Sequence, residues 1–200
     1  MLILFGVLAV ADLVAVALGI EWLEWVAKPL LCLVLAAYVL RTAPRQRLLA
    51  IGLVFGSAGD TALMVDGQVA FLVGMTAFLV MQICYIAVFV RMGSRPRWAA
   101  VAYLLVWAAA AVVLWQPLGG LAVPVLVYGL TLVTMAALAA GVNLVAGVGA
   151  GLFVFSDFLV GLGVTGTDFT GRSVILMTTY ILAQFLIVRG VLRAAPDPRP

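Results

Sequence analysis

The stretch Gly52-Leu-Val-Phe-Gly56-Ser-Ala-Gly-Asp60 is an apolar, glycine-bearing segment that ends on a carboxylate, and it has a later counterpart in Gly149-Ala-Gly-Leu-Phe-Val-Phe-Ser-Asp157. Both carboxylates are embedded in long hydrophobic sequence. A charged group at such a depth in a membrane is costly and by default marks a functional site. Because the two segments lie in separate halves of the chain, they predict a site formed where those halves meet.

The composition of the whole chain places both segments in a bilayer. Hydrophobic residues make up 66% of the 200 residues and charged residues only 10%, whereas soluble domains average about 45–50% apolar and about 25% charged. No water-soluble fold of this size could bury so much apolar surface. The net charge of +3 is carried by short loops between apolar runs, which indicates membrane orientation rather than nucleic-acid binding.

The apolar runs predict an all-α, polytopic fold. A helix needs about 20 residues to cross the hydrocarbon core, and the runs are continuous rather than alternating, which favours helices over strands. The connections are too short for a soluble domain, so residues 1–200 are expected to form a single transmembrane domain. The eight predicted spans are residues 2–19, 25–40, 47–65, 68–90, 98–114, 121–140, 143–163 and 172–193.

The loop charges predict the orientation of these spans. Positive charge favours the cytoplasmic side, so both termini and the even-numbered loops are expected in the cytoplasm. Two basic residues depart from this rule: Arg172 is in an external loop and Lys28 lies within a span. The nine basic residues that follow the rule are Arg41, Arg45, Arg47, Arg91, Arg95, Arg97, Arg189, Arg193 and Arg199.

The two halves also resemble each other weakly. In each half a proline near the start of a span is followed about thirty residues later by the buried aspartate. Four spans per half would give both halves the same orientation, which is typical of a parallel duplication. We therefore expect two pseudo-repeats, about residues 1–95 and 96–195. The spacings are 31 residues from Pro29 to Asp60 and 33 residues from Pro124 to Asp157.

The polar residues within the spans form the candidate site. With a rise of about 1.5 Å per residue, most of them fall in the outer half of the bilayer, although some lie nearer the midplane. Two are expected to be catalytic, Asp60 and Asp157. The expected substrate-binding residues are Lys28, Gln82, Tyr85, Tyr128, Tyr180 and Gln184.

Several of these residues have purely structural alternatives. Lys28 can extend to the interface or form an ion pair with an aspartate. Gln82 and Gln184 can hydrogen-bond between helices, and Asp12 of the first span can pair with a hydroxyl of a neighbouring helix. Glycine pairs with the GxxxG spacing are explained by close helix packing without any ligand; they are Gly52/Gly56 and Gly147/Gly151.

The chemistry open to this site is narrow. The chain has no histidine, no nucleophile elbow and no phosphate-binding loop, and without histidine or clustered cysteine a zinc site is not expected. We expect no metal and no cofactor. Two carboxylates in a low-dielectric cleft can differ in protonation, one acting as acid and the other as base. This arrangement suits hydrolysis through an oxocarbenium-like state, and a bilayer substrate would be a lipid with an acid-labile ether.

A set of short motifs, taken in order, resembles the YhhN-like lysoplasmalogenase family from the second span to the eighth. The resemblance implies an eight-span membrane hydrolase that cleaves the vinyl ether bond of lysoplasmalogens. Its products would be a fatty aldehyde and a headgroup such as glycerophosphocholine or glycerophosphoethanolamine. The motifs are Lys28-Pro29, Gly59-Asp60, Phe71-x-x-Gly74-x-x-x-Phe78, Gln82-x-x-Tyr85, Pro124-x-x-x-Tyr128, Phe155-Ser156-Asp157 and Tyr180-x-x-x-Gln184.

The substrate and the class of protein still have alternatives. Many relatives carry histidine at the position of Gln82, so either histidine is not required or this member's activity is altered. The lysine-poor composition indicates a GC-rich bacterial genome and hence an inner-membrane location. Many bacteria make no plasmalogens, so a related lysolipid is an alternative substrate.

The rival class is a small proton-coupled transporter or amphiphile-binding protein. A transport site should lie near the midplane, whereas the acids here favour the outer half. A purely structural scaffold does not explain the buried ionisable groups.

Overall fold

The computed structural model describes residues 1–195, apart from the side chains of Arg97 and Leu114. All regular structure in this range is helical, which confirms the all-α prediction, and every predicted span coincides with a helix to within four residues at either end. Arg199 lies outside the described residues. The elements are α1 (Leu2–Leu18), α2 (Glu21–Thr42), α3 (Arg47–Leu63), α4 (Gln68–Arg91), α5 (Arg97–Leu118), the 3₁₀ turn η1 (Gly119–Leu121), α6 (Ala122–Val142), α7 (Leu144–Val164) and α8 (Arg172–Ala194).

Local chemistry explains where these helices begin and end. α1 ends at Gly19, whose φ of 68° lies in the left-handed region that favours glycine. α2 begins four residues earlier than predicted because Glu21 and Glu24 are in its first turn, where acidic side chains interact favourably with the helix dipole. Between α6 and α7 a single residue, Asn143, turns the chain. Its side-chain carbonyl accepts a hydrogen bond of 2.9 Å from the Ala146 N–H and so caps α7.

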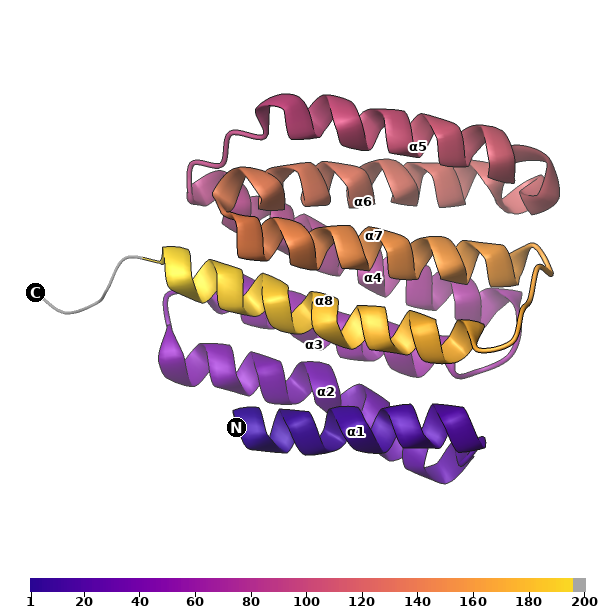
Figure 1. Cartoon of the computed structure of the whole chain (residues 1–200), viewed down its shortest axis with the longest axis horizontal. Helices are drawn as coiled ribbons and strands as arrows, with labels where there is room; N and C mark the ends of the chain where they lie inside the picture. Colours follow the sequence, from indigo (N-terminus) through magenta and orange to yellow (C-terminus); the bar gives the residue numbers. More distant parts are fainter. Residues whose placement is uncertain (196–200) are drawn as a thin grey trace, which may run out of the picture.

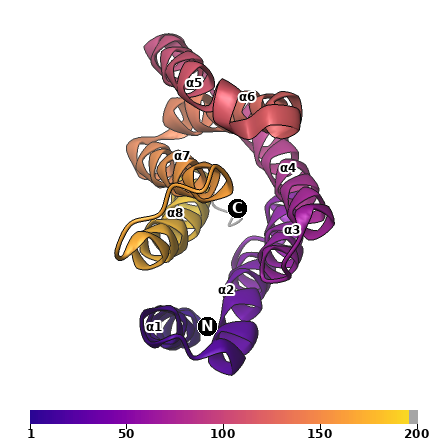
Figure 2. The same cartoon turned by 90° about the vertical axis from the view of Figure 1, so that its right-hand side faces the viewer.

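The helices lie side by side and form a ring (Figures 1 and 2). Going round the ring, the neighbours are α1, α2, α3, α4, α6, α7 and α8, and α8 contacts α1 to close it. α5 lies outside the ring and packs mainly against α6. Consecutive helices are neighbours within each half of the chain, but the duplication of the two halves stays a prediction.

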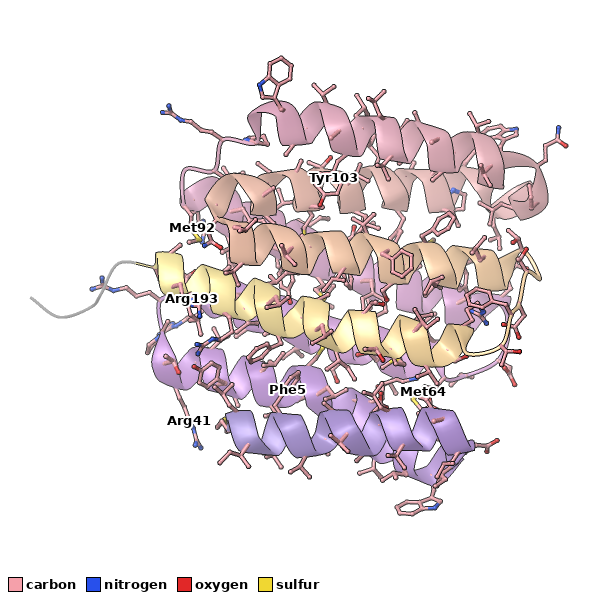
Figure 3. The ribbon with its side chains drawn as sticks, viewed as in Figure 1. Phe5, Arg41, Met64, Met92, Tyr103 and Arg193 are labelled. Carbon is pink, nitrogen blue, oxygen red and sulfur yellow. The ribbon has the colours of Figure 1, made fainter. Side chains whose placement is uncertain are left out.

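The two ends of the bundle differ in charge and in packing. Arg41 and Arg193 lie at one end and Met64 lies toward the opposite end (Figure 3), and the N-terminus is at the end of Arg41 and Arg193 (Figure 1). We call these the arginine end and the Met64 end. The buried hydrophobic core fills the ring toward the arginine end, where its large, fully buried members include Leu35, Leu49, Phe89, Met135 and Ile187. The Met64 half of the ring is less completely filled.

The outer surface is that of a multi-pass membrane protein. Five segments are long and apolar enough to cross a bilayer by length and composition: α2, α4, Trp115–Val142, α7 and α8. α1 and the stretch Trp98–Val113 of α5 are shorter apolar helices. Large hydrophobic side chains project outward from this bundle, including Ile3, Trp98, Val112 and Leu144, each more than 80% exposed. Such a surface is matched by lipid rather than water.

Glycine allows the closest helix contacts, as the packing explanation of the GxxxG pairs requires. A Cβ at Gly56 of α3 would lie 2.8 Å from Met81 Sδ of α4. Between α7 and α8 the approach involves backbone, because a Cβ at Gly190 would lie 2.5 Å from the Ala146 nitrogen. The glycine-bearing stretch before Asp60 therefore sets α3 tightly against α4 and fixes the position of its terminal carboxylate.

Candidate active site

A cavity of about 970 Å³ occupies the Met64 half of the ring. Every helix of the ring contributes to its lining, from Val16 of α1 to Tyr180 of α8, and so do residues of the α3–α4 loop such as Asp66. Five of the eight predicted site residues line it: Lys28, Asp60, Tyr128, Asp157 and Tyr180. The structure thus brings together residues from both halves of the chain around one space.

Asp60 is held at this cavity by two other helices. It lies in the last turn of α3 and is only 6% exposed. The Tyr180 hydroxyl of α8 donates a hydrogen bond of 2.7 Å to its Oδ2 atom. The Cys32 thiol of α2 lies 3.9 Å from the same oxygen and 3.2 Å from the Tyr180 hydroxyl. The carboxylate is therefore fixed in place by side chains distant in sequence.

Asp157 has a similar partner on a different helix. It lies on α7, and the Tyr128 hydroxyl of α6 donates a hydrogen bond to its Oδ2 atom. Among the described side chains, the ion pairs join Lys28 to Glu24 and Arg172 to Asp168, so neither Asp60 nor Asp157 is in one. Each of these two carboxylates instead accepts a hydrogen bond from a tyrosine hydroxyl, a group that can both donate and accept such bonds.

The two cations of the cavity are bound locally. Lys28 forms an ion pair with Glu24, one turn earlier on α2, rather than with an aspartate of another helix. Arg172 donates from Nε to Asp168 Oδ1 at 2.8 Å and from Nη1 to the Leu159 carbonyl at 3.1 Å. The hydrogen bond from Arg172 Nε, followed by the one from the Phe169 backbone N–H, holds the pKa of the exposed Asp168 carboxyl below its ordinary value.

Arg172 and Glu24 line the cavity although they were not predicted as site residues. The signal for Arg172 was its position as the one basic residue of the external loops. That signal was interpreted only as an exception to the charge rule.

The remaining predicted residues lie deeper in the bundle and are not among the residues that line the cavity. Tyr85 of α4 donates a hydrogen bond of 2.7 Å to Gln184 Oε1 of α8, which is the interhelical arrangement anticipated for the glutamine. The Gln82 amide and the Asp12 carboxylate are buried and have no hydrogen-bond partner among the described residues. The structure therefore supplies no helix hydroxyl as a partner for Asp12.

Apolar side chains complete the cavity. The Phe78 ring of α4 meets the Tyr180 ring edge-on, with centroids 6.1 Å apart. The space therefore combines carboxylates, charged residues at its Met64 end and a hydrocarbon-like wall. The wall residues include Phe71, Met75, Phe78, Val125, Leu176 and Met177.

These features define the class: a polytopic α-helical membrane protein with an amphiphilic, carboxylate-lined cavity inside its ring of helices. The sequence model of the YhhN family matches residues 23–191, and the chain belongs to the YhhN family. Over 188 residues it is 31% identical to the human (Homo sapiens) protein "Lysoplasmalogenase TMEM86B", covering 90% of this chain and 80% of the human one. No solved structure matches the chain. The resemblance found from the motifs is thus confirmed.

Proposed function

We propose that this protein is a lysoplasmalogenase-like hydrolase. It would cleave the vinyl ether bond of a lysoplasmalogen, or of a related lysolipid, to a fatty aldehyde and a glycerophospho-headgroup. The observation that carries the proposal is that two carboxylates, the buried Asp60 and the half-buried Asp157, line one cavity. Membership of the YhhN family and similarity to a human lysoplasmalogenase support it.

In the mechanism that we infer, the two aspartates act as acid and base. One donates a proton to the vinyl ether carbon that lies β to the oxygen, which generates an oxocarbenium ion. The other takes a proton from water as that water adds to the oxocarbenium carbon, giving a hemiacetal. Collapse of the hemiacetal breaks its bond to the glycerol oxygen and releases the aldehyde and the alcohol. The tyrosine partners, Tyr128 and Tyr180, would orient the carboxylates and the water.

The form of the cavity suits a single-chain lipid. Its volume of about 970 Å³ is at the upper end of the usual range for ligand pockets, about 300–1,000 Å³. Apolar walls would hold the first part of the alkenyl chain, and the charged Met64 end would face the headgroup. Because the packed core fills the arginine half of the ring, this arrangement favours a hydrolase over a transporter with access from both sides.

The direct test uses two lipids that differ in one bond. Purified protein is incubated with a lysoplasmalogen and, in parallel, with an ester lysophospholipid of the same headgroup and chain length. We expect aldehyde from the first and no fatty acid from the second, because a vinyl ether accepts a proton on carbon and an ester does not. Fatty acid release from the ester alone would instead identify an esterase. If the protein turned over neither lipid, the proposed function would be refuted.

We also propose that all eight helices span a bacterial inner membrane with both termini in the cytoplasm. The arginine-rich loops at one end and the parallel arrangement of the helices support this orientation. In a background lacking Cys32 and Cys84, Asp66→Cys in the α3–α4 loop should react with a membrane-impermeant maleimide in intact cells. Arg95→Cys in the α4–α5 loop should react only after lysis. The reverse pattern would indicate the inverted topology, and labelling of both residues in intact cells would contradict the single span, α4, between them.

A further inference from the structure

Arg172 is a charged cavity residue that the proposed mechanism does not use. It begins α8, exposes only 20% of its side chain and lines the same cavity as the two aspartates. The guanidinium lies over Gly163 of α7, where a Cβ would be 2.6 Å from Nη1. Glycine at this position therefore leaves the space that the guanidinium occupies.

The hydrogen bonds of Arg172 leave part of its guanidinium fork, the planar set of N–H donors, free. A guanidinium has five N–H groups. One at Nε reaches Asp168 and one at Nη1 reaches the Leu159 carbonyl, so three have no acceptor among the described residues. The Asp168 side chain is 75% exposed, and an ion pair on the solvent side is weak and readily exchanged. Arg172 is thus fixed in position but incompletely satisfied.

The position of this fork relative to Asp157 matches the length of a glycerol unit. The guanidinium contacts α7 between Leu159 and Gly163, two to six residues beyond Asp157. At 1.5 Å per residue this is about 3–9 Å along the helix axis, toward the Met64 end. In a lysophospholipid, a three-carbon glycerol of comparable length separates the ether oxygen from the phosphorus. A lipid with its ether at the aspartates therefore has its phosphate near Arg172.

We propose that Arg172 binds the phosphodiester of the lysolipid headgroup and so determines which amphiphiles are positioned for cleavage; this inference rests on the proposed function. The planar fork can donate two parallel hydrogen bonds to phosphate oxygens. Lys28 is less suited to this role because its ammonium is engaged with Glu24 within α2. The phosphate takes the place of Asp168 on the fork while the Leu159 contact keeps the guanidinium in place.

The test measures binding without turnover, so that its failure is distinct from failure of the proposed function. The probe is a saturated 1-alkyl lysophosphocholine, which has no vinyl ether to cleave, and the reference is the 1-alkylglycerol of the same chain. Equilibrium binding of both is measured with protein in nanodiscs. We expect the wild-type protein to bind the phosphate-bearing lipid at least about tenfold more tightly than the alkylglycerol. Arg172→Gln should lower the affinity for the phosphate-bearing lipid by about 10–100-fold and have little effect on the affinity for the alkylglycerol.

Two variants separate headgroup binding from a structural role of the ion pair. Asp168→Asn removes the competing carboxylate, so phospholipid binding should be retained or become tighter. Arg193→Gln removes an arginine at the opposite end of the bundle (Figure 3) and should change the affinity for neither lipid. The proposal is overturned if the wild-type protein binds the two lipids equally tightly. It is also overturned if Arg172→Gln and Asp168→Asn each lower the affinity for the two lipids to the same extent. Displacement of the probe by equimolar inorganic phosphate would assign the fork to free phosphate and overturn the lipid assignment.

Discussion

Asp60→Asn and Asp157→Asn are each expected to lower kcat for aldehyde release by about 10²–10⁴-fold, the usual contribution of a positioned general acid or base. Asparagine has nearly the shape of aspartate and can still accept the hydrogen bond from Tyr180 or Tyr128. It can neither deliver nor take the proton that the proposed reaction moves.

A matched control comes from the same cavity. Asp66 lines it from the α3–α4 loop, and no tyrosine hydrogen bond or ion pair fixes its carboxylate among the described residues. Asp66→Asn should therefore retain most of the wild-type turnover. Thermal melting and gel filtration in detergent should show that all three variants remain folded. Wild-type turnover in a folded Asp60→Asn or Asp157→Asn variant would refute the two-carboxylate mechanism.

The sequence was sufficient to predict the helices because a segment that crosses a bilayer must satisfy its backbone hydrogen bonds internally, as a helix does. Continuous apolar runs between arginine-bearing loops give spans directly, and the glycine spacing before Asp60 predicts a tight helix contact. The predicted span began at residue 25, so the N-terminal extension of α2 over Glu21 and Glu24 was missed. In the structure they lie in the first helical turn, where the helix dipole favours them.

The grouping of the site residues was only partly predictable. Depth along a helix can be counted from the sequence, but the direction that a side chain faces depends on which helices are neighbours. α4 packs against α6, which is not its neighbour in the sequence, and no local pattern indicates this. Tyr85 and Gln184 consequently bond to each other below the cavity, while Tyr180 reaches Asp60 across 120 positions of the chain. Arg172 was missed for the same reason, since its contacts with α7 depend on the tertiary packing.

The tyrosines provide the second large expected effect, and they separate catalysis from stability. Tyr180→Phe removes the hydroxyl that donates to Asp60, and Tyr128→Phe removes the one that donates to Asp157. A hydrogen bond to a charged group contributes about 1.5–3 kcal/mol, and 1.36 kcal/mol corresponds to a tenfold change in rate. Each variant should therefore lower kcat by about 10–150-fold, provided that its carboxylate must be held in one orientation to act.

Tyr85→Phe is the matched comparison, because it removes a buried tyrosine hydroxyl of the same bundle that is outside the cavity lining. Its loss leaves Gln184 Oε1 without the 2.7 Å hydrogen bond that joins α4 to α8, and a buried unsatisfied acceptor costs about 1–3 kcal/mol. We expect a lower melting temperature with kcat close to wild type, the opposite of the pattern for Tyr180→Phe. The measurements are kcat for aldehyde release and thermal melting of the same preparations. If Tyr85→Phe lowered kcat as much as Tyr180→Phe, the chemistry would extend below the cavity, and the assignment of the site to the Asp60 and Asp157 pairs would fail.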